Sequence, residues 1–161
     1  MSVWVVNASP LILLGKIARL SLLAELSESV VIPHEVALEI DAGPAADPAR
    51  LWLAAHGRNL VTIPESFDLR VVAWDLGKGE TAVICQALSK PGSVCILDDR
   101  AARDCARLFG ARVKGTLGVL MLAKQAGLIP AVRPEIEALL NSGAMLHEGV
   151  VREALQLAGE S

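Results

Sequence analysis

The sequence predicts an α/β domain in which helices cover both faces of a central parallel sheet. Short, fully apolar runs alternate along the chain with longer segments whose apolar residues recur at helical spacing. A parallel strand is buried on both faces and is therefore apolar throughout, and its alternation with helices is typical of β-α units. The 161 residues, of which 53% are hydrophobic, suit a single large core.

The predicted elements follow one another with short connections. Ser9 and Pro10 are typical of a helix start, and Gly15 is expected to break the first helix in two. The segment 41–48 is dense in Gly, Pro and Asp and is predicted to be a loop, whereas 64–74 favours no single structure. Strands are expected at 3–6, 30–32, 60–63, 94–97 and 112–114, and helices at 11–26, 34–40, 49–56, 77–88, 99–109, 116–125, 134–141 and 147–158.

The whole chain, residues 1–161, is predicted to be one domain. Too few residues precede the loop at 41–48 to form a separate core, and no internal repeat or low-complexity tract is present. The chain ends in two helices, within about 130–158, that carry many apolar residues. We expect these helices either to pack on the domain or to form the face of a homodimer.

Composition and charge narrow the functional class. The net charge is −3, so the chain lacks a strongly basic overall character, and the basic cluster at 100–114 is either a local basic patch or the solvated face of a helix. The three cysteines have no CxxC spacing, which favours free, buried thiols in a reducing cytoplasm. No apolar run reaches the roughly 18 residues of a membrane span, and no secretory signal is recognisable. We therefore expect a cytoplasmic protein that does not contact a membrane.

Polar residues stand where the predicted strands end. Asn7 follows the first strand, and Asp98 and Asp99 follow the fourth. Glu39 lies in the short helix after the second strand, and Glu80 lies in the first turn of the helix before the fourth. Ligands of parallel sheets bind beyond the carboxyl ends of the strands. Carboxylates that meet there repel one another unless a cation lies between them, and oxygen ligands suit Mg²⁺ or Mn²⁺.

Each of these residues also has an ordinary structural role, and spacing alone does not choose between the two. Asp99 can be the N-cap of its helix, and Glu80 is favourable in a first turn because of the helix dipole. Asn7 can close a turn before the first helix, and Glu39 can be a solvated helix residue.

Other chemistries lack the residues that they need. His34, His56 and His147 are too far apart in sequence for zinc-ligand spacing. The glycines at 77–79 and 115–118 precede helices, but they match neither a phosphate loop nor a dinucleotide fingerprint. A nucleophile-elbow serine is absent as well. A Rossmann-like enzyme acting on small molecules would require the missing phosphate loop.

Five segments of the chain are informative together. They are VVNASPLILLGKIARLSLL at 5–23, VVIPHEVALEI at 30–40, LGKGETAVICQAL at 76–88, CILDDRAARDCARLFG at 95–110 and VKGTLGVL at 113–120. In this order and spacing, over about 3–128, they resemble the PIN domain family. The chain looks most like a bacterial and archaeal branch that is described as predicted nucleic-acid-binding proteins.

The resemblance implies a fold, an activity and partners. It implies a three-layer α/β/α sandwich with a central parallel sheet, and metal-dependent cleavage of single-stranded RNA or DNA. Many bacterial members are toxins that a small cognate antitoxin inhibits, and many form homodimers. From the resemblance we therefore expect a ribonuclease toxin that uses Mg²⁺ or Mn²⁺, with single-stranded RNA, an antitoxin protein and a second copy of itself as partners.

The resemblance also implies site residues. The acids of the family fall by motif on Asn7, Glu39, Glu80 and Asp99, with Asp98 as an adjacent candidate. Metal binding is implied for the four carboxylates, and the Asn7 amide would hold the metal or the attacking water. Most members have an aspartate where this chain has Asn7. An amide oxygen can still bind the metal, but it brings no charge and lowers the expected affinity.

Three further residues complete the expected site. Arg100 and Arg103 would contact phosphates, which positions a nucleic acid without selecting its sequence. Thr116 would border the site unless it serves as a helix N-cap. Because Asn7 lacks a charge, a second interpretation stays open, in which the domain binds RNA or a protein without cutting. Metal-dependent turnover separates the two interpretations.

Overall fold

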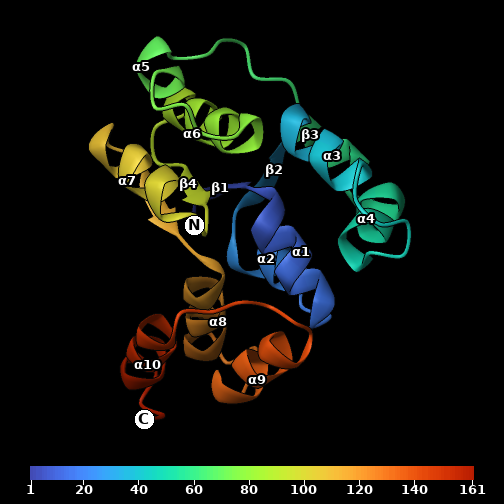
Figure 1. The fold of residues 1–161 in the computed structure, drawn as a ribbon, viewed down its shortest axis with the longest axis vertical. Coiled ribbons are helices and arrows are strands. Elements are labelled where there is room, and N and C mark those ends of the chain that lie inside the picture. The colour runs from blue at the N-terminus through green and yellow to red at the C-terminus, as the bar shows by residue number, and fades with distance from the viewer.

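A five-stranded parallel sheet forms the centre of the protein, as seen in a computed structural model that describes residues 1–161 (Figure 1). The strand order is β3-β2-β1-β4-β5, and every neighbouring pair is parallel. The predicted α/β class with a central parallel sheet is confirmed. The strands are β1 (Val3–Val6), β2 (Ser29–Pro33), β3 (Val61–Thr62), β4 (Val94–Ile96) and β5 (Arg112–Lys114).

Helices cover both faces of this sheet. Helix α1 contacts α3, α4 and α8, and α6 contacts α3, α5 and α7. None of the helices combines the length and the apolar character that a membrane crossing requires. They are α1 (Ala8–Lys16), α2 (Ser21–Leu26), α3 (His34–Asp41), α4 (Pro48–Trp52), α5 (Leu69–Val72), α6 (Lys78–Ser89), α7 (Arg100–Leu108), α8 (Thr116–Gln125), α9 (Arg133–Asn141) and α10 (Glu148–Leu157).

Strand β1 is central because all of its residues are apolar. Each of them is buried, and the strand pairs with β2 on one side and with β4 on the other. Val5 lies opposite Val31 in one neighbour and Cys95 in the other. A strand without a polar face is stable only in such a place, between two strands and under helices on both faces. Its end therefore lies in the middle of the carboxyl edge, the edge of the sheet at which the parallel strands end.

The cysteines are part of the core. Cys85, Cys95 and Cys105 are free and buried, as the sequence predicts. Burial raises the pKa of all three thiols, and that of Cys95 to about 12. Thiols that ionise so reluctantly are poor nucleophiles and poor metal ligands, so they serve packing.

The first helical segment is broken as predicted, although not at the predicted residue. Helix α1 begins earlier than expected, at Ala8, and the break lies at 17–20, where Ala18 has a φ of 58°. Gly15 stays inside α1. A Cβ atom at Gly15 would lie 3.0 Å from the backbone nitrogen of Ala49, so the glycine allows α4 to approach α1 closely. Its role is packing between helices rather than helix termination.

The segment between α3 and α6 differs most from the prediction. The helix expected at 49–56 is α4 followed by a π-helical turn, Leu53–Gly57, and a 3-10 turn, Arg58–Leu60. Strand β3 is shorter than predicted because it is an edge strand that pairs with β2 alone. Helix α5 lies in the stretch for which the sequence favoured no structure, and the Asp68 side chain caps it.

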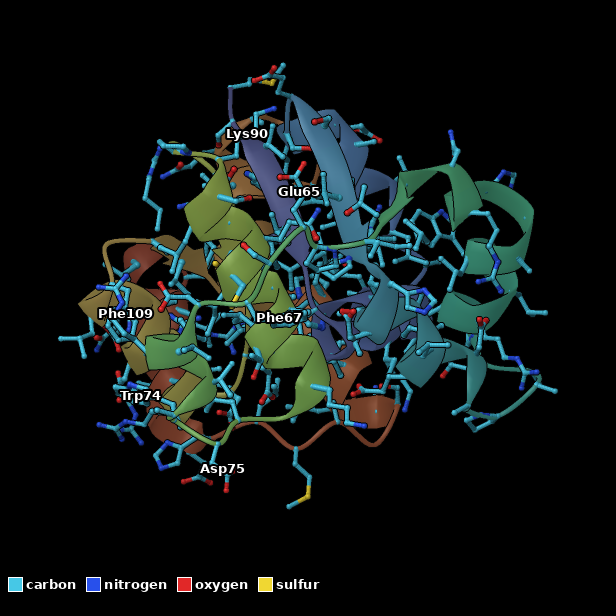
Figure 2. All side chains as sticks on the ribbon, turned by 90° about the horizontal axis from the view of Figure 1, so that it is seen from above. Glu65, Phe67, Trp74, Asp75, Lys90 and Phe109 are labelled. Carbon is cyan, nitrogen blue, oxygen red and sulfur yellow. The ribbon has the colours of Figure 1, made fainter.

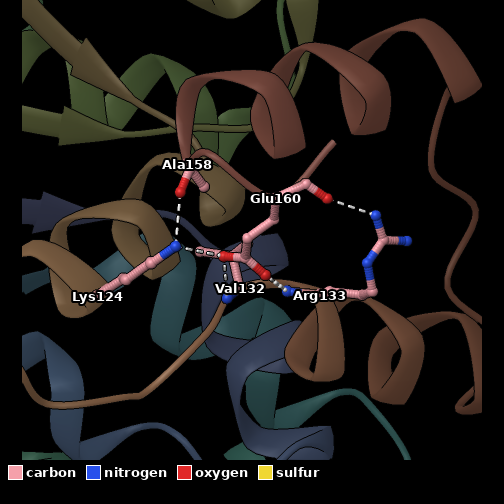
Figure 3. Close-up of polar contacts among 5 residues, drawn as sticks. All are labelled: Lys124, Val132, Arg133, Ala158 and Glu160. Carbon is pink, nitrogen blue, oxygen red and sulfur yellow. Dashed lines mark hydrogen bonds and ion pairs between the residues drawn. The ribbon is translucent and has the colours of Figure 1, made fainter.

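Glu160 connects the end of the chain to α8 and α9 (Figure 3). Its carboxylate accepts hydrogen bonds from Lys124 Nζ at 2.9 Å and from the backbone N–H groups of Val132 at 2.8 Å and Arg133 at 2.9 Å. The bond from Lys124 and those from the two backbone groups lower the pKa of Glu160 to about 2. The ionised carboxylate is therefore the form that the fold stabilises.

A second charged contact holds α9. The guanidinium of Arg19 donates to both carboxylate oxygens of Glu135, with a shortest distance of 2.6 Å, and the Glu135 side chain is only 10% exposed. Bidentate pairs of this kind are stronger than single hydrogen bonds. Together the two contacts attach the C-terminal helices to α8 and to the α1–α2 connection. A homodimer that uses these helices stays a prediction.

The Glu160 contacts predict a stability term that depends on pH. The pKa of Glu160 in the folded state lies below the ordinary value of 4.5, so its contribution is complete above about pH 4.5 and is lost as the pH falls toward 2. Glu160→Gln should lower the Tm by a few degrees at pH 7 and by progressively less below pH 4.5. Thermal melting by circular dichroism measures this difference.

The control is Glu153→Gln, which removes an exposed carboxylate from α10 and should leave the Tm unchanged. An equal loss of Tm for Glu160→Gln at pH 7 and at pH 3 would show that the carboxylate charge does not contribute.

Candidate functional site

The carboxyl edge gathers the polar residues that the sequence singled out, because three helices begin there. Asn7 is the N-cap residue of α1 after β1, Asp99 that of α7 after β4, and Gly115 that of α8 after β5. The first N–H groups of a helix have no partner within the helix, so helix starts favour negative charge nearby. The edge therefore combines acidic side chains with a backbone environment that tolerates anions.

Asn7 stands in the middle of this edge. Its backbone N–H donates to the Ile96 carbonyl at 3.1 Å, which extends the pairing of β1 with β4 by one step. The residue is only 5% exposed, yet its side chain makes no capping hydrogen bond. An asparagine at an N-cap normally accepts such a bond from the helix. The Asn7 amide is therefore left available for a ligand at the edge.

Gly79 allows a close approach to Asn7. A Cβ atom at Gly79 would lie 3.2 Å from Oδ1 of Asn7, 3.4 Å from Cγ2 of Val36 and 3.7 Å from Oε1 of Glu39. Helices α3 and α6 pack against each other, which brings Glu39 of α3 to the start of α6. An amide oxygen and a carboxylate oxygen from distant parts of the sequence thus lie beside the same glycine, and a larger residue at position 79 would crowd them.

Glu80 experiences the charges of two other predicted residues. Burial raises the pKa of Glu80 most, a hydrogen bond from the Gly77 N–H at 3.1 Å opposes this, and the charges of Asp99 and Glu39 raise it further. The charges of Glu39 and Asp99 thus act on Glu80 in the same direction as its burial, although no three of the acids lie close enough to enclose an ion. The Glu80 carboxylate also fills its predicted ordinary role, since it binds the start of its own helix.

Asp99 is the N-cap of α7, as the sequence allowed. Its Oδ2 accepts a hydrogen bond from the Ala102 N–H at 3.0 Å. The residue is exposed, and its charge contributes to the raised pKa of Glu80. A capping role and proximity to the other acids are therefore both present.

Asp98 has its own set of partners, distinct from those of Asp99. Its Oδ1 accepts from the Thr116 N–H at 2.7 Å, and its Oδ2 accepts from the hydroxyls of Thr116 at 2.7 Å and Ser9 at 3.0 Å. These bonds join the ends of β4 and β5 to the start of α1. Gly115 occupies the N-cap position that the sequence left open for Thr116. Thr116 therefore serves to hold Asp98.

The two arginines that were expected to contact phosphates lie in different settings. Arg103 Nη1 donates to the Leu97 carbonyl at 3.0 Å, and a Cβ atom at Gly115 would lie 2.6 Å from the same nitrogen. This guanidinium is packed into the turn after β4 and supports it. Arg100, the first residue of α7, is exposed and forms no ion pair. Of the two arginines, Arg100 is therefore the one whose guanidinium can contact a ligand at the edge.

The carboxyl edge offers donors for a divalent ion without enclosing one. Oxygens of Asn7 and Glu39 lie beside Gly79, and Glu39 and Asp99 both act on Glu80. No three acidic, histidine or cysteine side chains lie close enough to enclose an ion. Glu80 and Asp99 instead accept hydrogen bonds from the starts of their own helices. Carboxylate and amide oxygens are ligands of the kind that a hard divalent ion takes, and Glu80 and Asp99 could reach such an ion only by turning away from their caps.

Ser9 and Gly79 take part in this geometry although the sequence did not mark them as site residues. The sequence predicts Ser9 as an N-cap, whereas its hydroxyl binds Asp98. A glycine within the first turn of a helix is less favourable than alanine by about 1 kcal/mol. Its presence directly before Glu80 is the signal that indicates close approach of another group.

In a comparison with known protein families, almost the whole chain matches one family. Residues 3–160 match a family described as the PIN domain. The match extends beyond 3–128, the part in which the sequence segments show the resemblance. No curated protein and no solved structure is significantly similar to the chain.

The raised pKa of Glu80 predicts that this carboxylate destabilises the metal-free protein at neutral pH. A carboxyl group with a folded-state pKa above 4.5 favours folding only while protonated, and this advantage is lost as the pH rises through that pKa. Glu80→Gln keeps the acceptor for the Gly77 N–H and removes the charge. In EDTA it should raise the Tm by a few degrees at pH 7 and leave it unchanged at pH 4.

Differential scanning calorimetry at both pH values measures this effect. Glu137→Gln, an exposed carboxylate of α9, controls for the change in net charge. A lower Tm for Glu80→Gln at pH 7 would mean that the charge of Glu80 stabilises the folded protein, which would contradict the expected repulsion.

Proposed function

Because the chain belongs to the PIN domain family and has a nuclease-type fold, we propose that it is a divalent-metal-dependent ribonuclease and the toxin of a toxin–antitoxin pair. PIN domains generally depend on divalent metal ions. Two observations support the proposal: oxygens of Asn7 and Glu39 lie beside the same glycine, Gly79, and the charges of Glu39 and Asp99 both act on Glu80. Repulsion that a cation would relieve is the electrostatic feature of a metal site before the ion binds.

In the proposed site, Glu39, Glu80 and Asp99 hold Mg²⁺ or Mn²⁺, directly or through water. A bound ion of this kind lowers the pKa of water and stabilises charge on a phosphodiester during hydrolysis. Asn7 supplies an amide oxygen without charge, which lowers the affinity for the ion. The Asn7 amide also supplies N–H donors, and these can orient a water molecule or a phosphate oxygen that an aspartate would repel.

Asp98 is a positioning residue in this proposal. Its oxygens are occupied by Thr116 and Ser9, so it fixes the turn that carries Asp99. Arg103 supports the same turn through the Leu97 carbonyl. Rigid support of this kind keeps the functional groups in place, which a site needs in order to be effective.

The substrate in this proposal is single-stranded RNA, which would lie across the carboxyl edge. Arg100 is exposed there and would contact a phosphate group. Hydrolysis adds water across the phosphodiester, so one product ends in a phosphate and the other in a hydroxyl group. The partner proteins are an antitoxin and a second copy of the chain. The exposed apolar residues Leu69 of α5 and Leu108 of α7 offer surface for such contacts.

The metal site predicts opposite effects for two substitutions beside it. Asn7→Asp adds a carboxylate, so it should lower the Tm in EDTA and increase the rise in Tm that Mn²⁺ produces. Gly79→Ala changes no charge but crowds the oxygens of Asn7 and Glu39, so it should weaken Mn²⁺ binding. Isothermal titration with Mn²⁺ should give Kd values in the order Asn7→Asp, wild type, Gly79→Ala, from tightest to weakest.

Cleavage of a fluorescent single-stranded RNA by the same proteins tests the reaction. Mn²⁺ should stimulate cleavage by the wild type, and Glu80→Gln should abolish it. Gly118→Ala is the control for alanine in a helix, since the nearest atom to a Cβ there lies 3.7 Å away. Equal Mn²⁺ affinity in all variants, with no cleavage, would exclude the metal-dependent nuclease and favour a domain that only binds.

A further inference from the structure

A cavity opens beside the carboxyl edge. It has a volume of about 280 Å³ and lies between α3 and the segment that leads into α6. Glu35 lies one helical turn before Glu39 on the same face of α3, and Lys78 comes shortly before Glu80 in α6. The cavity is therefore next to the candidate site. Its apolar wall is formed by Phe67, Val72 and Leu76, and its polar wall by Glu35, Asp75 and Lys78.

The polar wall contains a carboxylate oxygen without a partner. Oε2 of Glu35 is buried and accepts no hydrogen bond. A buried acceptor left in this state is unfavourable, so native structures satisfy nearly all such atoms. Lys78 does not satisfy it, because Lys78 forms no ion pair. The carboxylate of Glu35, which lines the cavity, is therefore left without a partner within the chain.

The apolar wall offers a ring to stack against. Phe67 is 42% exposed, although it lines the cavity, and it lies on the segment that crosses the outer side of α6 (Figure 2). Unstacked bases of single-stranded RNA bind to proteins by stacking on exposed aromatic rings and by hydrogen bonds to their edges. The cavity volume lies just below the roughly 300 Å³ at which pockets for larger ligands begin, and it suits one planar base.

The charges of the cavity select the chemistry of the ligand. Glu35 and Asp75 outnumber Lys78, so a phosphate group is disfavoured and an edge that presents N–H donors is favoured. Guanine presents two adjacent donors, N1–H and the 2-amino group, to a carboxylate. Adenine and cytosine present one amino group beside an acceptor nitrogen, and uracil presents one N–H between two carbonyl oxygens. The unpartnered carboxylate therefore matches guanine best.

We propose that this cavity is a base subsite that binds guanine next to the phosphodiester that is cut, with Glu35 bound to the Watson–Crick edge and Phe67 stacked on the ring. The proposal rests on the ribonuclease function proposed above and adds the base preference of the same site. It assigns Glu35 to specificity and not to metal binding.

Binding of nucleosides to the metal-free protein tests the subsite without any cleavage. Guanosine should bind on the order of tenfold tighter than adenosine, cytidine or uridine, as one bidentate contact allows. Inosine lacks the 2-amino group and should bind more weakly than guanosine. NMR titration should show shifts for the amides of Lys78 and Thr81, which border the cavity.

Two variants assign the contacts. Glu35→Gln should abolish the preference for guanosine. Phe67→Leu should weaken the binding of all four nucleosides to the same extent. Glu65→Gln removes an exposed carboxylate that does not line the cavity, so this variant should bind the nucleosides with the affinities of the wild type. Thermal melting of each variant verifies that it folds. If Glu35→Gln folds and keeps the preference, Glu35 does not read the base.

Cleavage assays separate this proposal from the proposed function. RNA with a single G in a run of U should be cut at the G by the wild type, and any cleavage by Glu35→Gln should show no preferred position. Cleavage without preference for G would overturn the subsite and leave the nuclease intact. Guanosine preference that depends on Glu35, in a protein that cuts no RNA, would support the subsite and overturn the nuclease. Equal binding of all four nucleosides would overturn the subsite whatever the protein cuts.

Discussion

Burial of strand β1 is the constraint on which the rest of the structure depends. Every residue of β1 is buried, so the strand is stable only between β2 and β4 and beneath two layers of helices. The next residue, Asn7, must then lie in the middle of the carboxyl edge, where its backbone continues the pairing with β4. The strand order also places the helices that follow β2 and β4 on either side of it. One apolar strand thus determines where the polar residues meet.

The polar residues at this edge combine structural and electrostatic roles. Asp98 gains three hydrogen bonds that join two strand ends to α1, and Arg103 supports the same turn. Asp99 and Glu80 cap or bind their own helices, yet they remain close enough for repulsion to raise the pKa of Glu80. The caps keep these carboxylates satisfied in the absence of an ion. An ion that binds here would have to compete with these caps.

The parts of the fold that depend on local patterns could be predicted from the sequence. Apolar runs indicated the strands, and Asp99 before its helix indicated a cap that the structure contains. Contacts between distant segments could not be predicted. Gly15 appeared to end a helix because its partner, Ala49, lies in another helix. Edge strand β3 is short because it lacks a second neighbour, a fact that only the topology reveals.

In the candidate site, too, local sequence patterns predicted some features, and contacts between distant segments could not be predicted. The positions of Asn7 and Asp99 after strands predicted their place at the edge, whereas the bonds of Asp98 to Ser9 and Thr116 depend on how two helix starts meet. Glu35 had no local signal, because the absence of a hydrogen-bond partner is a property of the folded chain. Sequence thus indicates which residues reach the edge, and packing decides what each of them contacts there.

The central claim is that Asn7, Glu39, Glu80 and Asp99 form one site for a divalent ion. Anomalous X-ray scattering from crystals grown with saturating Mn²⁺ tests it most directly, because it locates the ion without reference to activity. The account predicts a manganese peak beside Gly79, at about 2.0–2.2 Å from oxygens of Glu39 and Asp99. Crystals that hold Mn²⁺ elsewhere, with no peak at the carboxyl edge and with Glu80 still bound to Gly77, would contradict it.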